Sequence, residues 1–241
     1  MRLKNFLLAL IFFASISISF VIVAPFLILA FGITMQRNKA IVVGSAFFKT
    51  LLPILGIHPI VEGKHNIPKG RNFVLLSNHQ SFLDIGVLLH EVHPIAFLAK
   101  KELFRIPIFG FVLRFIGSLP IDRADRRANV HIAERMAINI KKGFNYCVYP
   151  EGTRSTTGEL LPFKNGIFRI IQKSPVAVLP VTIYGTGEIL PKKGFKLFPK
   201  RPRIIIHPLI ETEQIEKWNL DEFKSAVRHR IQLGLDMAKE L

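Results

Sequence analysis

The feature that most constrains this chain is an apolar run near its start, because no charged side chain lies between Lys4 and Arg37. About 20 apolar residues suffice to cross the hydrocarbon core of a bilayer. The run exceeds the roughly 7–15 residues of a signal-peptide core and lacks a clear small-residue cleavage site, so we expect it to be retained. Pro25 interrupts the run, and a second apolar stretch follows at residues 40–57. The sequence therefore predicts a membrane-associated hairpin of two helices over residues 1–60.

Basic residues lie at both ends of the first apolar stretch, as Arg2, Lys4, Arg37 and Lys39, and the first acidic residue is Glu62. Flanking positive charge is typical of the cytoplasmic side of a membrane. A hairpin that dips into one leaflet and returns fits this symmetry, whereas a single crossing would place one basic end outside. We expect attachment to the cytoplasmic membrane with the rest of the chain on the cytoplasmic side. A complete double crossing remains the alternative.

The remaining residues, 61–241, have the pattern of one domain, and we do not expect a second full one in a chain of 241 residues. Short apolar strands alternate with helical patterns. This alternation predicts an α/β fold with a mainly parallel central sheet covered by helices. The expected strands are 73–77, 95–98, 118–121, 146–149, 176–183 and 203–207, and the expected helices are 82–91, 108–116, 124–142, 163–173 and one from residue 221.

The net charge of +16, from 33 Lys and Arg against 17 Asp and Glu, predicts an anionic partner. Nucleic acid is disfavoured, because the sequence has no zinc-finger spacing, no aromatic ribonucleoprotein signature and no basic tail. A membrane phospholipid surface fits better. One basic stretch interleaved with apolar residues suits that surface or another acidic partner, with a solvated loop as the alternative. It contains Lys192, Lys193, Phe195, Lys196, Leu197, Phe198, Lys200, Arg201 and Arg203.

The single cysteine, Cys147, cannot form an internal disulfide, which indicates that the catalytic part faces a reducing compartment. His90 and His93 lie three residues apart, but no Cys or carboxylate cluster accompanies them, so we predict no metal site.

Two loops are expected to carry the chemistry, because reactive groups in open parallel sheets gather beyond the carboxyl ends of the strands. One is Asn78-His-Gln-Ser-Phe-Leu-Asp84 and the other is Pro150-Glu-Gly-Thr-Arg-Ser155. On one continuous helix His79 and Asp84 would point about 140° apart. Contact therefore requires His79 in the loop and Asp84 in the first turns of the next helix. Such a pair can remove a proton from an alcohol, although the pair alone also fits a structural turn.

Four ordered blocks resemble those of the glycerolipid acyltransferase superfamily, especially the bacterial 1-acyl-glycerol-3-phosphate acyltransferases. The blocks are Asn78-His-x4-Asp84, Gly117-Ser-Leu-Pro-Ile-Asp-Arg123, Glu151-Gly-Thr-Arg154 and Val178-Leu-Pro180. Ala99-Lys-Lys-Glu-Leu103, with Pro107 and Gly110, and Leu161-Pro-Phe-Lys164 strengthen the resemblance. It covers roughly residues 61–207.

The resemblance implies transfer of a fatty acyl group from acyl-CoA or acyl-ACP (acyl carrier protein) to the sn-2 hydroxyl of 1-acyl-glycerol-3-phosphate. The product would be phosphatidic acid, and neither a cofactor nor a covalent intermediate would be needed. His79 would be the general base and Asp84 its partner. The resemblance assigns acceptor binding to Gly117, Arg123, Glu151, Gly152, Thr153 and Arg154, with Lys100 or Lys101 as a further positive contact.

The residues themselves support this chemistry, because the sequence has no Gly-x-Ser-x-Gly nucleophile motif and Arg is suited to bind a phosphate. Gly152 is expected to allow a turn with positive φ or a close approach of ligand to backbone. Structural alternatives stay open, since Arg123 could pair with Asp122 or Asp125, and Lys101 with Glu102. Three other functions also remain: an acyltransferase for another lysophospholipid, a non-catalytic anionic-lipid-binding protein, and a thioesterase.

Overall fold

The computed structural model describes residues 2–19, 22, 37–92, 95–122, 130–193 and 195–240, and within them the chain forms a seven-stranded sheet. The strands are β1 (Ile60–Glu62), β2 (Val74–Ser77), β3 (Ala96–Lys100), β4 (Leu119–Ile121), β5 (Tyr146–Val148), β6 (Val178–Tyr184) and β7 (Arg203–Ile206). Their order is β1-β7-β6-β2-β5-β3-β4.

Every strand pair is parallel except β6 and β7. The predicted mainly parallel sheet is therefore confirmed. Between the antiparallel strands β6 and β7 the described helix is α8 (Thr186–Ile189), which has four residues. The carboxyl ends of β2 and β5 lie at the same edge, because Leu76 pairs with Val148.

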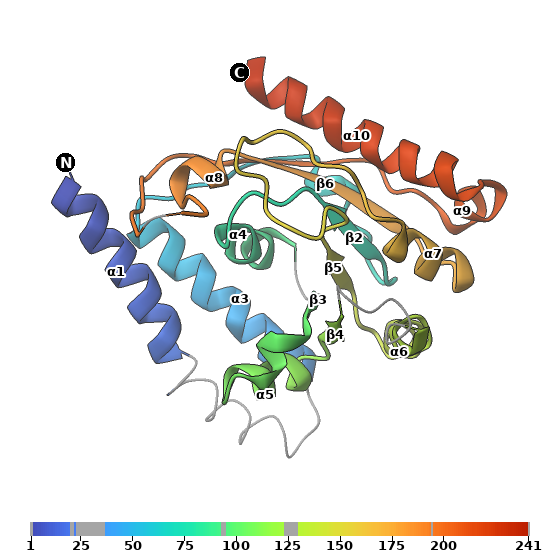
Figure 1. Ribbon diagram of the computed structural model, residues 1–241, viewed down its shortest axis with the longest axis horizontal. Coiled ribbons are helices and arrows are strands. Elements are labelled where there is room, and N and C mark those ends of the chain that lie inside the picture. Colours follow the sequence, from blue (N-terminus) through green and yellow to red (C-terminus); the bar gives the residue numbers. More distant parts are fainter. Residues whose placement is uncertain are drawn as a thin grey trace.

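Helices cover both faces of the sheet (Figure 1). One layer contains α1 (Arg2–Ile18), α3 (Arg37–Ile54) and α4 (Leu83–Glu91), and the other contains α6 (Val130–Lys141), α7 (Asn165–Lys173) and α10 (Leu220–Glu240). Alternate residues of each strand point into the two layers. Leu75 packs in the core with α3 and α4, and its neighbours Val74 and Leu76 pack in the core with α6, α7 and α10. Burial on both faces explains why the strands are almost wholly apolar.

The two N-terminal helices expected from the apolar stretches are present, and α3 shares a core with the sheet. Leu52 and Leu55 of this segment are buried together with Leu75 and Leu83. Gly86 lets α3 approach α4 closely, since a Cβ there would lie 2.6 Å from the Phe48 ring. Within the described residues, no helix is both long and apolar enough to span a bilayer. The tip of the predicted hairpin, including Pro25, lies outside the described residues.

Several element predictions differ from the structure in detail. Helix α6 was expected to start near residue 124, but residues 123–129 lie outside the described part, and α7 starts at Asn165 rather than 163. No pattern in the sequence predicted the three-residue β1, the helix α8 or the helix α9 (Thr212–Lys217). These elements are too short for a hydrophobic period to develop. The connector helices η2 (Lys64–Asn66) and η3 (Lys101–Arg105) and the helix α5 (Phe109–Phe115) complete the fold.

A pair of glycine substitutions tests how tightly β1 is joined to β7. Gly63 and Gly70 have nearly the same backbone, with φ of +73° and +71°. A Cβ at Gly63 would lie 2.0 Å from the carbonyl oxygen of Ile206, whereas one at Gly70 meets nothing within 4 Å. Gly70→Ala should lower the free energy of unfolding by about 1–2 kcal/mol, and Gly63→Ala by about 3 kcal/mol or more, measured by urea unfolding. Equal losses would contradict the close approach.

Candidate active site

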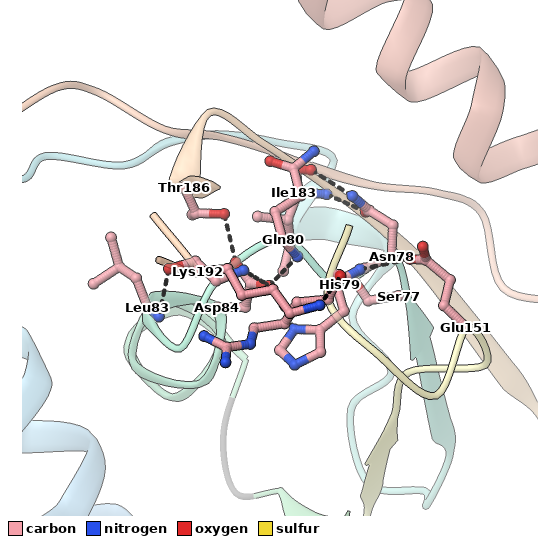
Figure 2. Close-up of polar contacts among 12 residues, drawn as sticks. Ser77, Asn78, His79, Gln80, Leu83, Asp84, Glu151, Ile183, Thr186 and Lys192 are labelled. Carbon is pink, nitrogen blue, oxygen red and sulfur yellow. Dashed lines mark hydrogen bonds and ion pairs between the residues drawn. The ribbon is translucent and has the colours of Figure 1, made fainter. Parts of the chain in front are cut away.

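The first loop brings His79 and Asp84 together at the carboxyl end of β2 (Figure 2). His79 follows the strand in the loop, and Asp84 is the second residue of α4. Nδ1 of His79 lies 2.7 Å from Oδ2 of Asp84. This strand-loop-helix geometry is the one that the spacing required, so the predicted contact is confirmed.

Asp84 is fully buried, and its carboxylate accepts hydrogen bonds from four donors. Oδ2 accepts from the backbone N–H groups of Gln80 at 2.7 Å and Ser81 at 2.9 Å, as well as from His79. Oδ1 accepts from the hydroxyl of Thr186, the first residue of α8. A buried carboxylate is costly unless it is paired, and this set of donors supplies the pairing.

The contact also determines which nitrogen of His79 is basic. A carboxylate oxygen can only accept, so the proton of the neutral imidazole lies on Nδ1 and the lone pair on Nε2. The ring is held from a second side by Tyr149, on which it stacks with centroids 3.9 Å apart and an angle of 12°. His79 therefore has the tautomer and the fixed orientation that a general base requires.

Asn78 and Ser81 fix the backbone of the loop. The Asn78 amide donates to the carbonyl of Ile183 at 2.7 Å and accepts from the N–H of Ile183 at 2.8 Å, which joins the loop to β6 (Figure 2). The Ser81 hydroxyl donates to the carbonyl of Leu190 and accepts from the N–H of Leu83. Ser81 thus has a structural role.

The second loop, after β5, holds the main chain of His79. Oε1 of Glu151 accepts from the His79 N–H at 2.7 Å, and the N–H of Ser155 donates to the His79 carbonyl at 2.8 Å. Oε2 of Glu151 accepts from the N–H of Leu161 at 2.9 Å. Glu151 is buried and both of its oxygens are engaged. These contacts give it a role in positioning His79, and direct contact with the acceptor stays a prediction.

Arg228 of α10 stabilises the segment that follows the second loop. Its guanidinium donates to the carbonyls of Leu161 at 2.7 Å and Leu160 at 3.2 Å, and it lies 5.4 Å from the centroid of the Phe163 ring. Burial raises the pKa of Glu151 to about 7. The two backbone hydrogen bonds and the charge of Arg228 act in the opposite direction, and Asp84 adds to the rise.

Arg154 lies beside an apolar side chain at the rim of the site. Its guanidinium carbon is 4.1 Å from the centroid of the Phe82 ring, a cation–π distance, and Phe82 is 52% exposed. Lys192 donates to the Arg154 carbonyl at 2.9 Å and to the Thr153 hydroxyl at 3.4 Å. Lys192 thus contacts the loop that carries Arg154, although the stretch that contains Lys192 was not predicted to contact this loop.

Gly152 has the predicted positive φ, at +68°, and a Cβ there would lie 3.1 Å from the side chain of Lys164. Gly117 also has a positive φ, at +81°, and its carbonyl accepts from the Tyr146 hydroxyl at 2.7 Å. A Cβ on Gly117 would lie 2.7 Å from the Phe144 ring. The turn at Gly117 therefore requires glycine for packing, and its part in acceptor binding stays a prediction.

The structure shows ion pairs for both lysines that were assigned a phosphate contact. Lys100 lies 3.5 Å from Glu102, and Lys101 pairs with Asp122. The alternatives left open by the sequence were a pair of Lys101 with Glu102 and a pair of Arg123 with Asp122 or Asp125, whereas in the structure Asp122 pairs with Lys101 and Glu102 lies beside Lys100. Arg123 itself lies outside the described residues.

Cys147 is fully buried, and burial raises the pKa of its thiol, so it is not available as a nucleophile. Among the described residues, no group of three or more His, Cys, Asp or Glu side chains has the arrangement of a metal site.

Sequence reasoning missed four residues that hold this site: Thr186, Tyr149, Arg228 and Phe82. Thr186 is 102 positions from Asp84, and Arg228 lies on a helix far along the chain. No local pattern links such positions. Tyr149 was assigned to a strand, and its contact with His79 depends on the pairing of β2 with β5.

Comparison with known proteins identifies the family. Residues 58–184 match the acyltransferase family. The crystal structure of the 1-acyl-sn-glycerophosphate acyltransferase PlsC from Thermotoga maritima superimposes with a TM-score of 0.86 and 32% identity, covering 99% of this chain and 98% of that one. The chain belongs to the acyltransferase family. The predicted resemblance and fold class are thereby confirmed.

Named relatives come from plants, a green alga, bacteria, yeast and mammals. The chloroplast 1-acyl-sn-glycerol-3-phosphate acyltransferase BAT2 of Brassica napus is 38% identical over 67% of this chain, and the chain spans about half of it, 48%. The 1-acyl-sn-glycerol-3-phosphate acyltransferase of Borreliella burgdorferi is 31% identical over 80% of this chain and 78% of its own length.

The raised pKa of Glu151 predicts a pH-dependent stability. A carboxyl whose folded pKa is raised stabilises the fold fully below its unfolded value of 4.5, and this stability is lost as the pH rises through about 7. As the pH rises from 4.5 to about 7, the free energy of unfolding of the wild type should fall by up to about 3 kcal/mol relative to that of Glu151→Gln, whose side chain does not titrate. Urea unfolding across this range measures the difference, and a constant gap would show that Glu151 has its ordinary pKa.

Proposed function

We propose that this acyltransferase moves a fatty acyl group from acyl-CoA or acyl-ACP to the sn-2 hydroxyl of 1-acyl-glycerol-3-phosphate, giving phosphatidic acid. The observation that carries the proposal is the contact of His79 Nδ1 with the buried carboxylate of Asp84 at 2.7 Å, which leaves Nε2 as the base. The relatives from Brassica napus and Borreliella burgdorferi are 1-acyl-sn-glycerol-3-phosphate acyltransferases, which supports the choice of acceptor.

In this reaction Nε2 of His79 takes the proton of the acceptor hydroxyl as its oxygen attacks the thioester carbonyl. The C–S bond then breaks, and the departing thiolate takes the proton from His79. Asp84 stabilises the imidazolium that exists between these steps. No enzyme nucleophile is needed, in agreement with the structural hydrogen bonds of Ser81 and the burial of Cys147.

Arg154 is the proposed contact for the acceptor phosphate. A guanidinium can bind two phosphate oxygens at once, and the Phe82 ring beneath it keeps the group in place. The same ring presents apolar surface to an acyl chain. Arg123, Thr153, Lys100 and Lys101 remain further proposed contacts.

Attachment to the cytoplasmic face of a membrane is also proposed. Helix α1 exposes Leu3, Leu7, Leu10 and Ile11 by 46–70% of their surface, which is unusual for such large apolar side chains. The basic stretch from Lys192 to Arg203 would lie against anionic head groups or the acidic carrier of the acyl donor.

Replacing His79 by Ala tests the base. The rate of acyl transfer to lysophosphatidic acid should fall by at least about a hundredfold, with an unchanged circular dichroism spectrum. The exposed His229 of α10 provides the control, since His229→Ala should keep full activity. Retained transfer in His79→Ala would refute the assignment. Assays with other lysophospholipids, run with both acyl donors, test whether the protein prefers another acceptor. An assay without any acceptor tests for a thioesterase, which would release free fatty acid.

Replacing Arg154 by Ala tests the phosphate contact. The KM for lysophosphatidic acid should rise by about tenfold or more, because a charged hydrogen bond contributes about 1.5–3 kcal/mol. Monoacylglycerol, which lacks the phosphate, should be used equally by both proteins. Arg169→Ala, at an exposed position of α7, is the matched control. If both acceptors lost activity equally, Arg154 would have a role other than phosphate binding.

A further inference from the structure

The turn between η3 and α5 exposes three large apolar side chains within six residues. Ile106 is 49% exposed, Ile108 39% and Phe111 53%. Neither the His79 loop nor the Arg154 turn uses them. Exposed apolar side chains are unremarkable singly, but a cluster marks a contact surface.

The turn holds these side chains outward at a conformational cost. Ile108 has φ of 60°, the one positive value among the described non-glycine residues, and a β-branched side chain rarely adopts it. Such a conformation persists only where the surroundings impose it. Here the N–H of Gly110 donates to the Ile106 carbonyl at 2.8 Å, and that of Val112 donates to the Ile108 carbonyl at 2.9 Å.

Two further contacts make the turn rigid. A Cβ on Gly110 would lie 2.2 Å from the carbonyl oxygen of Phe104, so α5 packs directly against η3. Arg114 donates to the same carbonyl at 2.7 Å, and its guanidinium lies 5.8 Å from the centroid of the Phe104 ring. The apolar cluster is thus presented on a fixed support.

The chemistry around the cluster favours a lipid surface over a protein. Three side chains are far fewer than the roughly 20–30 residues per side of a stable protein interface. Arg105 precedes the cluster and is exposed, and a basic residue beside apolar ones suits an anionic bilayer. The chain carries a net charge of +16. In Figure 1, α5 lies at the bottom of the molecule with the end of α1 and the start of α3, and α10 lies at the top.

We propose that the turn at residues 105–111 inserts Ile106, Ile108 and Phe111 into the same leaflet as α1, so that the catalytic domain itself touches the bilayer. The proposal rests on the proposed function, because a lysophospholipid acceptor resides in the bilayer. A second contact point, apart from α1, fixes the orientation of the domain on the membrane.

Site-specific labelling tests the proposal, since the native Cys147 is fully buried and does not compete for a thiol reagent. Phe111→Cys, Leu10→Cys on α1 and Leu233→Cys on α10 each receive a nitrobenzoxadiazole label. Leu233 is a matched control, because it is 49% exposed and belongs to α10, a helix that lies at the opposite end of the molecule from α5 in Figure 1. The full-length proteins are mixed with vesicles of phosphatidylcholine and phosphatidylglycerol whose acyl chains are brominated or not.

Quenching by the brominated chains is expected at positions 10 and 111 and not at 233. Quenching at position 10 alone would overturn the proposal and leave membrane attachment intact. No quenching at either position would overturn the proposal and membrane attachment together, whereas the test with His79→Ala would still decide the chemistry. A label at position 111 that responds to protein concentration without vesicles, and not to brominated chains, would assign the surface to a second copy of the chain.

Replacing Phe111 by a charged residue tests the same membrane contact independently. Phe111→Glu should lower the partition coefficient onto these vesicles by about tenfold or more, because an apolar contact is lost and an anion is added. Its activity in detergent micelles should be unchanged, which verifies folding. Leu233→Glu should partition like the wild type. Wild-type partitioning of Phe111→Glu would overturn the proposal.

Discussion

The buried carboxylate of Asp84 is the interaction on which the site depends. It accepts from the His79 ring, from two backbone N–H groups of the loop and from Thr186. An ionised carboxylate without these donors could not remain fully buried at a tolerable free energy. The shape of the loop, the tautomer of His79 and the position of α8 therefore follow from one requirement.

The burial of the Asp84 carboxylate also depends on the N-terminal helix α3, because it packs against α4. Asp84 can occupy its position only if α4 starts directly after the loop and packs on the sheet, and α3 covers α4 from outside. The Ser45 hydroxyl donates to the Leu89 carbonyl, and Phe48 packs against Gly86. The boundary at residue 60 stays a prediction, but α3 packs as part of the layer that holds the catalytic loop. An element predicted from its apolar sequence as a membrane segment thus also supports the site.

The sequence predicted the parts of the site that are local. His79 and Asp84 lie on one strand-loop-helix unit, so their spacing and the apolar pattern around them were sufficient. The positioning role of Glu151 could not be predicted, because it depends on the pairing of β2 with β5, which brings residues 72 positions apart into contact. For the same reason the partner of Lys101 could not be predicted. The alternative considered was its sequence neighbour Glu102, whereas in the structure Lys101 pairs with Asp122, 21 positions away, and Glu102 lies beside Lys100.

Arg154 and Phe82 show why the two loops must meet at one edge of the sheet. The proposed acceptor, 1-acyl-glycerol-3-phosphate, carries its acyl chain and its phosphate on the two outer glycerol carbons with the free hydroxyl between them, so a site for it needs a cation and an apolar surface close to the base. The second loop supplies the guanidinium and the first supplies the ring, with 4.1 Å between the guanidinium carbon and the ring centroid. The same first loop carries His79, so an acceptor held at Arg154 would bring its hydroxyl to the loop of the base. Parallel pairing of β2 and β5 produces this arrangement, because it places the carboxyl ends of both strands side by side.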